Sequence, residues 1–397
     1  MSIAGIAWRY AWARPLDAAL NVALLAFGIG TICLVLLFSS QVGERLLRDA
    51  EGIDLVVGAK GSPMQLILSG VYHLDAPTGN VPLADVQKLA LNRMVKQVIP
   101  LALGDSYRGY RVVGAPHEYV ALYGGKPATG RLWEAPMQVV LGSDTARATG
   151  LAVGAKFVGA HGLGESGGDA HEAHPFEVVG VLAATGSVLD RLILTSIESV
   201  WEMHEEHGAA AAVKAPDRQV TVALVRYASP LAAATLPRYV NERTGMQAAS
   251  PALETARLLR MVGVGVEVLR IFGYALVVVA ALGVFVALYN AMRDRRYDLA
   301  VIRVLGASPA KLFSIVLLEA LLLALVGAVL GILLGHAAAE AVGAWMAANQ
   351  QPPITGAVLM AEEAWLLALA ALTGVAAAAV PSWSAYRTDV AAALSQW

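Results

Sequence analysis

Four long apolar runs stand out along the chain, and one long polar stretch separates the first run from the second. The runs cover residues 18–40, 263–292, 312–339 and 364–386. Each is long enough to cross roughly 30 Å of hydrocarbon as a helix that rises about 1.5 Å per residue. The pattern predicts an α-helical membrane protein with four transmembrane helices, the second of which begins with the end of a stalk.

The polar stretch, residues 41–262, carries patterns of both strands and helices. Short apolar runs bounded by turn residues predict buried strands at 53–58, 139–142, 176–182 and 219–227. Apolar positions at helical spacing predict amphipathic helices over 83–93 and 229–242. We therefore expect an α+β extracytoplasmic domain between spans one and two.

The stretch 251–270 also reads as a helix and enters span two with only Gly263 and Gly265 as weak interruptions. We expect a helical stalk that continues span two into the outer domain.

Positive charges give the orientation of the spans. Arg9 and Arg14 precede the first span, and the loop 293–311 is rich in arginine, whereas the loop 340–363 has no lysine or arginine. Because positively charged short loops stay in the cytoplasm, both termini are predicted to be inside. The cytoplasmic segments are then 1–17, 293–311 and 387–397, and the outer segments are 41–262 and 340–363.

Composition agrees with a membrane protein and excludes several other classes. Apolar residues make up 57% of the 397 residues and charged residues 15%, so disorder is excluded. A net charge of -2 excludes a broadly basic nucleic-acid binder, and a single cysteine, Cys33, excludes a disulfide framework. The first apolar run exceeds the roughly 7–15 residues of a signal-peptide core, which favours an uncleaved anchor.

Three segments carry a resemblance to a known family. They are AWRYAWARPLDAALNVALLAFGIG at 7–30, RDRRYDLAVIRVLGASPAKLFSIVLLE at 293–319 and PSWSAYRTDVAAAL at 381–394. The chain resembles the permease subunits of the FtsX/MacB class of ABC transporters, which include the lipoprotein-releasing permeases. The resemblance implies four spans, a large extracytoplasmic domain and no ATPase activity in this chain. It also implies a multi-pass protein of the bacterial inner membrane, with its large domain in the periplasm.

The same resemblance implies a partner at the cytoplasmic face. The arginine-rich loop, a short helix with one apolar side, would dock on a separate ABC ATPase that binds ATP, two copies of which would serve two permease copies. A substrate or partner outside the membrane is implied, but the sequence does not identify it. The residues expected to couple to the ATPase are Arg293, Arg295, Arg296, Leu299, Ile302, Arg303, Leu305 and Gly306. Local physics alone favours an interfacial helix that only marks the inside, and it is the resemblance that favours coupling.

Span three contains residues that suit helix packing. Gly327, Gly331 and Gly335 repeat the small-xxx-small spacing that allows close helix approach, although the sequence does not indicate which helix they contact. Glu319 lies in the same span, where a carboxylate normally faces a partner or water. We expect it to make a structural contact with an arginine of the inner loop; the alternative is a role in transport.

Known catalytic motifs are lacking or lie in an unsuitable context. No GxxxxGK[ST] loop occurs, so ATP hydrolysis by that route is excluded. The GESGG run at 164–168 matches GxSxG, but it lies in a glycine-rich loop rather than between a strand and a helix. We expect no enzyme activity.

Histidines suggest an alternative function. All but one of the 8 histidines lie in the outer domain, where two HExH tetrads place imidazoles at i and i+3. Histidine and carboxylate ligands suit zinc, although neither tetrad has the spacing of a metalloprotease. The alternative is a membrane-anchored zinc-binding protein or sensor. Its candidate ligands are His161, Asp169, His171, His174, His204 and His207.

Overall fold

The computed structural model describes residues 15–161, 175–205, 218–294 and 301–387, together with residues 5, 7 and 9. The chain divides into two units. One, the membrane unit, comprises Met1–Val42 and Val262–Trp397, and the other, the outer unit, comprises Gly43–Met261.

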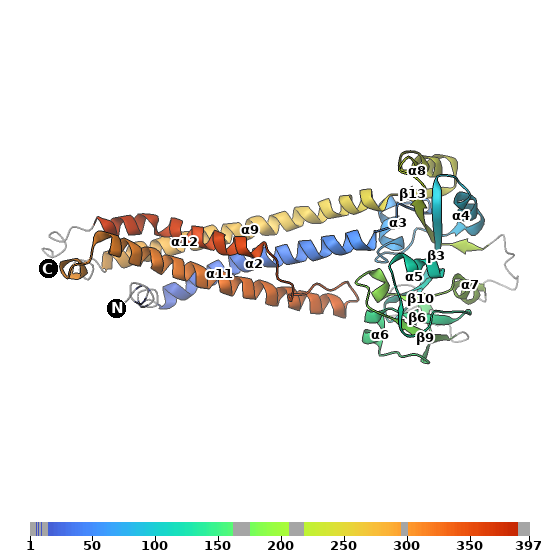
Figure 1. Cartoon of the computed structure of the whole chain (residues 1–397), viewed down its shortest axis with the longest axis horizontal. Coiled ribbons are helices and arrows are strands. Elements are labelled where there is room, and N and C mark those ends of the chain that lie inside the picture. The colour runs from blue at the N-terminus through green and yellow to red at the C-terminus, as the bar shows by residue number, and fades with distance from the viewer. Residues whose placement is uncertain are drawn as a thin grey trace. The chain divides into compact units, whose positions relative to one another are not determined.

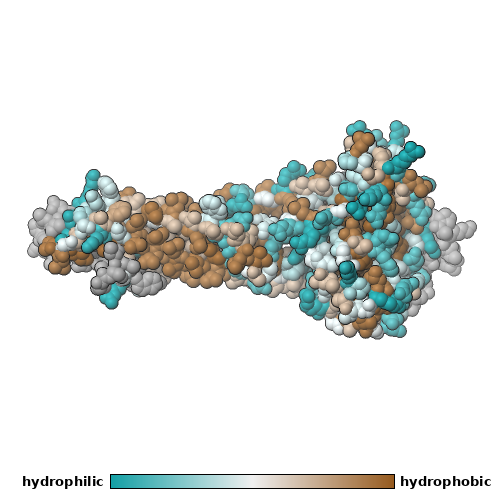
Figure 2. Space-filling view, in the orientation of Figure 1, coloured by the Kyte–Doolittle hydropathy of each residue, from teal (hydrophilic) through white to brown (hydrophobic). Residues whose placement is uncertain are grey.

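Four helices in the described residues are long and apolar enough to cross a membrane, as the sequence predicts. Figure 1 shows them running alongside one another. Their apolar side chains cover much of the surface seen in Figure 2, where lipid would contact them. Helix α2 covers Pro15–Asp49, α9 covers Pro251–Asp294, α11 covers Pro309–Ala348 and α12 covers Glu363–Tyr386.

Glycines allow α11 to pack closely on α2. A Cβ atom added at Gly331 would lie 2.8 Å from the carbonyl oxygen of Ala26, and one added at Gly335 would lie 2.7 Å from Cβ of Cys33. Gly327 of α11 likewise faces Leu25 of α2. The glycine repeat in span three therefore contacts span one, the point that the sequence left open. Such close contact supplies the dispersion attraction that holds helices together in lipid.

The segment after α11 folds back onto the helices. Gln41 on α2 exchanges two hydrogen bonds with the backbone of Thr355, at 2.8 and 2.9 Å. Glu340 on α11 accepts hydrogen bonds from the backbone N–H of Gly356 and the hydroxyl of Thr355. These bonds fix the predicted outer loop against spans one and three.

The outer unit is built on one mixed sheet. Among the described residues, an 11-stranded sheet has the order β13-β1-β12-β3-β4-β10-β6-β9-β5, with β7 paired to β9 and β8 to β3, and β2 pairs with β11 separately. The β10–β4 and β6–β9 pairs are parallel and the others antiparallel. The strands are β1 (Leu55–Ala59), β2 (Val81–Pro82), β3 (Val95–Tyr107), β4 (Tyr110–Gly114), β5 (Pro127–Gly130), β6 (Gln138–Leu141), β7 (Lys156–Phe157), β8 (Ala160–His161), β9 (Phe176–Leu182), β10 (Ile193–Thr195), β11 (Gln219–Val220), β12 (Val222–Tyr227) and β13 (Met246–Ala249).

Short helices cover this sheet and enclose two hydrophobic cores. One core lies between β1, β12, β13 and helices α4 and α8, and the other lies around β4, β6, β9 and β10. Helix α7 contributes Val200 to the first core and Met203 to the second. The helices are α3 (Pro63–Gly70), α4 (Leu83–Ala90), α5 (His117–Leu122), α6 (Ser143–Thr149), α7 (Ile197–Glu205) and α8 (Ala232–Arg243), with a 3-10 turn, η1, at Val188–Arg191.

The sequence patterns identified several of these elements. The structure confirms three predicted strands as β1, β6 and β9, and the two predicted helices as α4 and α8. The predicted strand 219–227 is divided into β11, which pairs with β2, and β12, which lies in the large sheet. It also confirms that the predicted helix from residue 251 runs into span two, because α9 is continuous through Gly263 and Gly265. The long strand β3 was missed because it contains Pro100, and a proline argues against a strand inside a sheet. Pro100 lies in the part of β3 that pairs with β12 and not with β4. The N–H group that proline lacks is therefore not needed for pairing with β4.

A glycine substitution tests the contact between α2 and α11. We predict that Gly331→Ala destabilises the protein by about 1–3 kcal/mol, because the added methyl forces two packed backbones apart. Gly263→Ala is the control, since a Cβ there meets nothing within 4 Å. Removing a glycine from a helix should stabilise the control by about 0.5–1 kcal/mol. Thermal unfolding in detergent measures both, and equal midpoints would contradict the close-packing role of Gly331.

Candidate functional site

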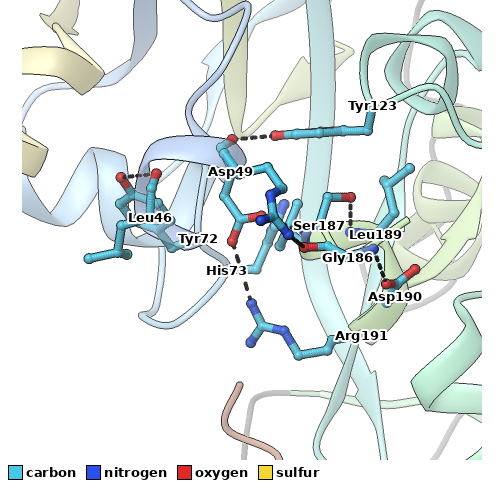
Figure 3. Close-up of polar contacts among 12 residues, drawn as sticks. Leu46, Asp49, Tyr72, His73, Tyr123, Gly186, Ser187, Leu189, Asp190 and Arg191 are labelled. Atoms are coloured by element: carbon cyan, nitrogen blue, oxygen red, sulfur yellow. Dashed lines mark hydrogen bonds and ion pairs between the residues drawn. The ribbon is translucent and has the colours of Figure 1, made fainter. Parts of the chain in front are cut away.

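The two helices that leave the membrane unit end together in the outer unit. We call this place the stalk junction: the last turns of α2 from Gly43, the first turns of α9 up to Met261, and the side chains that hold them. Tyr72, just after α3, is buried between them. Its hydroxyl donates to the carbonyl oxygen of Leu46 on α2 at 3.2 Å and is hydrogen-bonded to the hydroxyl of Thr255 on α9 (Figure 3 shows Tyr72 and Leu46). One side chain therefore connects both helices.

The last residue of α2, Asp49, is held from three directions (Figure 3). Its carboxylate accepts a hydrogen bond from the backbone N–H of Val188 at 2.7 Å and lies 3.9 Å from the guanidinium of Arg191. Its backbone carbonyl accepts a hydrogen bond from the hydroxyl of Tyr123 at 2.7 Å. Asp49 is only 2% exposed, so these bonds replace the water that a helix end normally binds.

A compact turn presents these partners to α2. The carboxylate of Asp190 accepts hydrogen bonds from the backbone N–H groups of Thr185 and Gly186. Gly186 has a φ of 69°, a left-handed conformation that glycine adopts without strain, and its carbonyl accepts a hydrogen bond from Arg48. Asp190 thus fixes the loop that places Val188 against Asp49.

A buried histidine lies beside the junction. Nε2 of His73 is 2.8 Å from the hydroxyl of Tyr119. Burial lowers the pKa of His73 well below its usual value, and the positive charges of Arg111 and Arg191 lower it further. Burial also lowers the pKa of Arg111 to about 10, although Asp75 opposes the shift. His73 is therefore neutral at physiological pH.

The junction tyrosines stay protonated for the same reason. Burial raises the pKa of Tyr72, Tyr119 and Tyr123, and the charge of Asp49 contributes to all three shifts. The hydroxyls of Tyr72 and Tyr123 therefore stay hydrogen-bond donors to carbonyl groups of α2, and that of Tyr119 stays a partner of His73. These bonds attach α2 to the rest of the outer unit.

The predicted coupling segment ends in a tight, well-defined turn. Residues 301–304 are helical, and Gly306, at φ 96°, closes that helix. The N–H of Gly306 bonds the carbonyl of Arg303, and the N–H of Ala307 bonds that of Ile302, the pattern of a Schellman motif. Ser308 then occupies the N-cap of α11, with Pro309 in its first turn. The LGASP sequence thus encodes a helix stop followed at once by a helix start.

The apolar residues of that segment face different ways. Ile302 packs against the cluster formed by α9, α11 and α12, whereas Val304 and Leu305 are 65% and 80% exposed. The predicted contact surface therefore includes Leu305, and Ile302 faces the chain's own helices. Arg293 is exposed at the end of α9, and Arg303 is partly buried. Arg295, Arg296 and Leu299 lie outside the described residues.

The remaining predicted site residues are distributed as follows. Glu319 is buried in α11. His161 lies on β8 opposite Asp105 of β3, and His204 lies near the end of α7. Asp169, His171, His174 and His207 lie outside the described residues, as do the side chains of His161 and His204. The zinc site in the outer domain remains a prediction.

Two groups of residues have no counterpart in the sequence predictions. No sequence motif marks the junction residues Asp49, Tyr72 and Tyr123. Only the length of the predicted stalk indicates that other residues must hold its end. In the membrane unit, the side chains of Cys33, His336 and Glu363 converge. They are too far apart in sequence for any spacing to indicate that they meet.

Comparison with known proteins gives two matching family models. The FtsX-like permease C-terminal model matches residues 270–390, and the MacB-like periplasmic core domain model matches residues 18–242. Together they place both units in one class of membrane protein, the ABC transporter permeases. The chain belongs to the FtsX/MacB-type permease family.

Two solved structures are similar to part of the chain. The periplasmic region of MacB from Actinobacillus actinomycetemcomitans is 12% identical, with a TM-score of 0.35, and the match covers 53% of this chain and 95% of that one. The extracellular domain of the noncanonic ABC-type transporter YknZ from Gram-positive bacteria is 15% identical, with a TM-score of 0.31, and the match covers 50% and 99%. No curated protein sequence matches the chain.

The Tyr72 connection predicts a local effect on both helices. In Tyr72→Phe the ring remains but the buried partners on Leu46 and Thr255 lose a hydrogen bond, at a cost of about 1–3 kcal/mol. Amide hydrogen exchange in 43–49 and 251–261 should accelerate roughly 5- to 150-fold. Tyr239→Phe, at a 45% exposed position, is the control and should leave exchange unchanged. Equal exchange in both variants would show that Tyr72 does not hold the junction.

The low pKa of His73 predicts a pH-dependent stability. Below about pH 6.5 the unfolded chain binds a proton at this histidine that the folded chain does not, so stability is full above that pH and is lost as pH falls. The loss should be up to about 1.4 kcal/mol per pH unit until the folded pKa is reached. His73→Asn keeps a residue that tolerates the φ of 54° but does not titrate. Urea unfolding at several pH values should show a smaller slope in the variant, and identical slopes would refute this assignment.

Proposed function

We propose that this chain is the permease subunit of an ABC transporter and couples ATP hydrolysis on a separate cytoplasmic ATPase to conformational work in the outer unit. The family supports this function. The observation that carries it is the continuity of α2 and α9, which join at Tyr72. With 35 and 44 residues, they extend about 52 and 66 Å, well beyond roughly 30 Å of hydrocarbon.

The turn at 301–309 supports a docking role for the inner side. Val304 and Leu305 are exposed apolar residues on a turn whose backbone is fixed by the Schellman motif. Ile302 joins the turn to the core formed by α9, α11 and α12. A force applied at Val304 and Leu305 therefore reaches the spans through packed side chains instead of a flexible loop.

At the other end, the stalk junction supports transfer to the outer unit. A change in the separation of α2 and α9 would strain the two bonds of Tyr72 directly. Movement of α2 alone would pull on Val188 and Arg191 through Asp49, and so on the loop held by Asp190. The sheet strands next to that loop would follow.

The complete assembly would contain more than one chain. We propose two permease copies and two ATPase subunits in a bacterial inner membrane, with the outer unit in the periplasm. Span two is suited to contact between copies, because only 28% of its most apolar stretch is buried within the chain, against 56% for span one. The outer partner or substrate would be of the kinds that this family handles, such as lipoproteins or an efflux partner.

Substitutions in the inner turn test the coupling proposal. We expect Val304→Asp with Leu305→Asp to reduce association with the ATPase by about tenfold or more, since losing interface anchors costs roughly 1–2 kcal/mol each. Leu359→Ser, at an 82% exposed position on the outer loop, is the matched control. The measurement is the amount of ATPase subunit that co-purifies with the tagged full-length chain from its native membrane.

Both outcomes of this experiment are informative. Loss of the ATPase in the double variant but not in the control would support docking at the turn. Undiminished ATPase in a normally inserted double variant would contradict docking there, and would leave the segment as an interfacial helix.

A further inference from the structure

Three side chains with metal-binding atoms meet inside the membrane unit. Sγ of Cys33, a ring nitrogen of His336 and a carboxylate oxygen of Glu363 all lie within 4.8 Å of one another. They come from three helices: α2, α11 and the first residue of α12. Cys33 is buried, and the side chains of His336 and Glu363 are only 14% and 12% exposed.

The orientation of His336 is that of a metal ligand. Its Nδ1 lies 2.6 Å from the carbonyl oxygen of Gly356, which can only accept, so Nδ1 carries the hydrogen in this bond. A carbonyl partner on one ring nitrogen is the usual support for a histidine that binds a metal through the other. In the neutral ring, Nε2 then presents a lone pair toward Cys33 and Glu363.

This arrangement requires a positive charge between the side chains. Nε2 is shielded from solvent and lies 3.1 Å from Oε1 of Glu363, the distance of an ion pair when the ring is protonated. A lone pair and a carboxylate oxygen this close repel each other unless a proton or a metal ion lies between them. Nitrogen and oxygen ligands of a tetrahedral zinc ion lie about 3.3 Å apart, close to the 3.1 Å between Nε2 and Oε1, and Sγ of Cys33 lies within 4.8 Å of both atoms.

Two glycines and one backbone bond preserve the space. A Cβ atom at Gly335 would lie 2.9 Å from Sγ of Cys33, so a side chain there would displace the thiol. Gly356 lies so close to the backbone of His336 that a side chain there would clash. Oε1 of Glu363 accepts a hydrogen bond from the backbone N–H of Met360, which fixes the carboxylate.

We propose that Cys33, His336 and Glu363 bind a divalent zinc-class metal ion. Thiolate, imidazole and carboxylate form a ligand set that zinc accepts, with a fourth position for water. On binding, the Cys33 thiol releases its proton to solvent, and so does His336 where it is protonated. A thiolate, a carboxylate and a doubly charged cation sum to zero net charge, which lowers the cost of burial.

The site would tie spans one, three and four together at one point. It is separate from the histidine tetrads of the outer domain, and it does not depend on the proposed coupling to an ATPase. Metal occupancy would restrict relative movement of α2 and α11, the two helices that the glycine repeat brings together.

The single cysteine makes the test specific. Cobalt(II) replaces zinc in such sites, and a thiolate bound to it gives a charge-transfer absorption band in the near ultraviolet. Because the chain contains only 1 cysteine, this band reports Cys33 alone, whatever the outer-domain histidines bind. The experiment adds cobalt(II), and then competing zinc, to the full-length chain in detergent, with size-exclusion profiles as the check on folding.

We expect the band in the wild type, its loss on adding zinc, and its loss in Cys33→Ser. His336→Gln and Glu363→Gln should each weaken cobalt binding at least tenfold. Glu362→Gln is the matched control, because this carboxylate is next to Glu363 in the chain but exposed. It should retain the band.

Two results would overturn the proposal. One is a folded wild type that shows no thiolate band at saturating cobalt(II), which would mean that a proton holds His336 and Glu363 together as an ion pair. The other is a band that persists at full strength in both His336→Gln and Glu363→Gln, which would show Cys33 binding metal without them.

Discussion

The end of a buried helix leaves carbonyl groups that need hydrogen-bond donors, and the outer unit is organised around meeting that need for α2. The carbonyl of Leu46 receives the hydroxyl of Tyr72, and the carbonyl of Asp49 receives the hydroxyl of Tyr123. Leaving such groups unpaired in a buried site would cost about 1–3 kcal/mol each. Because the donors belong to the outer unit, capping the helix and attaching it are the same interaction.

The two ends of the transmembrane system meet this requirement in opposite ways. At the inner turn the backbone satisfies itself through the Schellman motif around Gly306, so its exposed side chains remain available for a partner. At the stalk junction, side chains from distant parts of the chain satisfy α2, so the helix end is bound to its surroundings. On the coupling proposed above, the inner turn would receive a partner and the stalk junction would transmit movement.

Sequence periodicity predicted the parts of the fold that a local pattern governs. Spans, the continuous stalk and the strand FEVVGVL each follow from apolar spacing within the segment itself. The long strand β3 did not, because Pro100 gave a local signal against it that tertiary pairing with β12 overrides. Helix α3 was also missed, although Ser62 and Pro63 are a typical helix start.

The same distinction between local pattern and distant packing applies to the site residues. The coupling segment was recognised by its arginines and by a family resemblance, whereas the inward orientation of Ile302 needed the packing of three helices to be known. Tyr72 contacts residues of two separate segments, and Cys33, His336 and Glu363 lie on three helices. Contacts of this kind depend on how distant elements pack, and no spacing along the chain encodes them.

The small buried share of α9 has a consequence for the surrounding lipid. Only 28% of its most apolar stretch is buried within the chain, so most of that surface meets acyl chains unless a second copy covers it. A helix in this position responds to bilayer thickness by tilting, at a cost of fractions of a kcal/mol per ångström of mismatch. Because α9 is one unbroken helix from Pro251 to Asp294, a tilt of its apolar part would also turn its first residues. A change in bilayer thickness would therefore load the stalk mechanically.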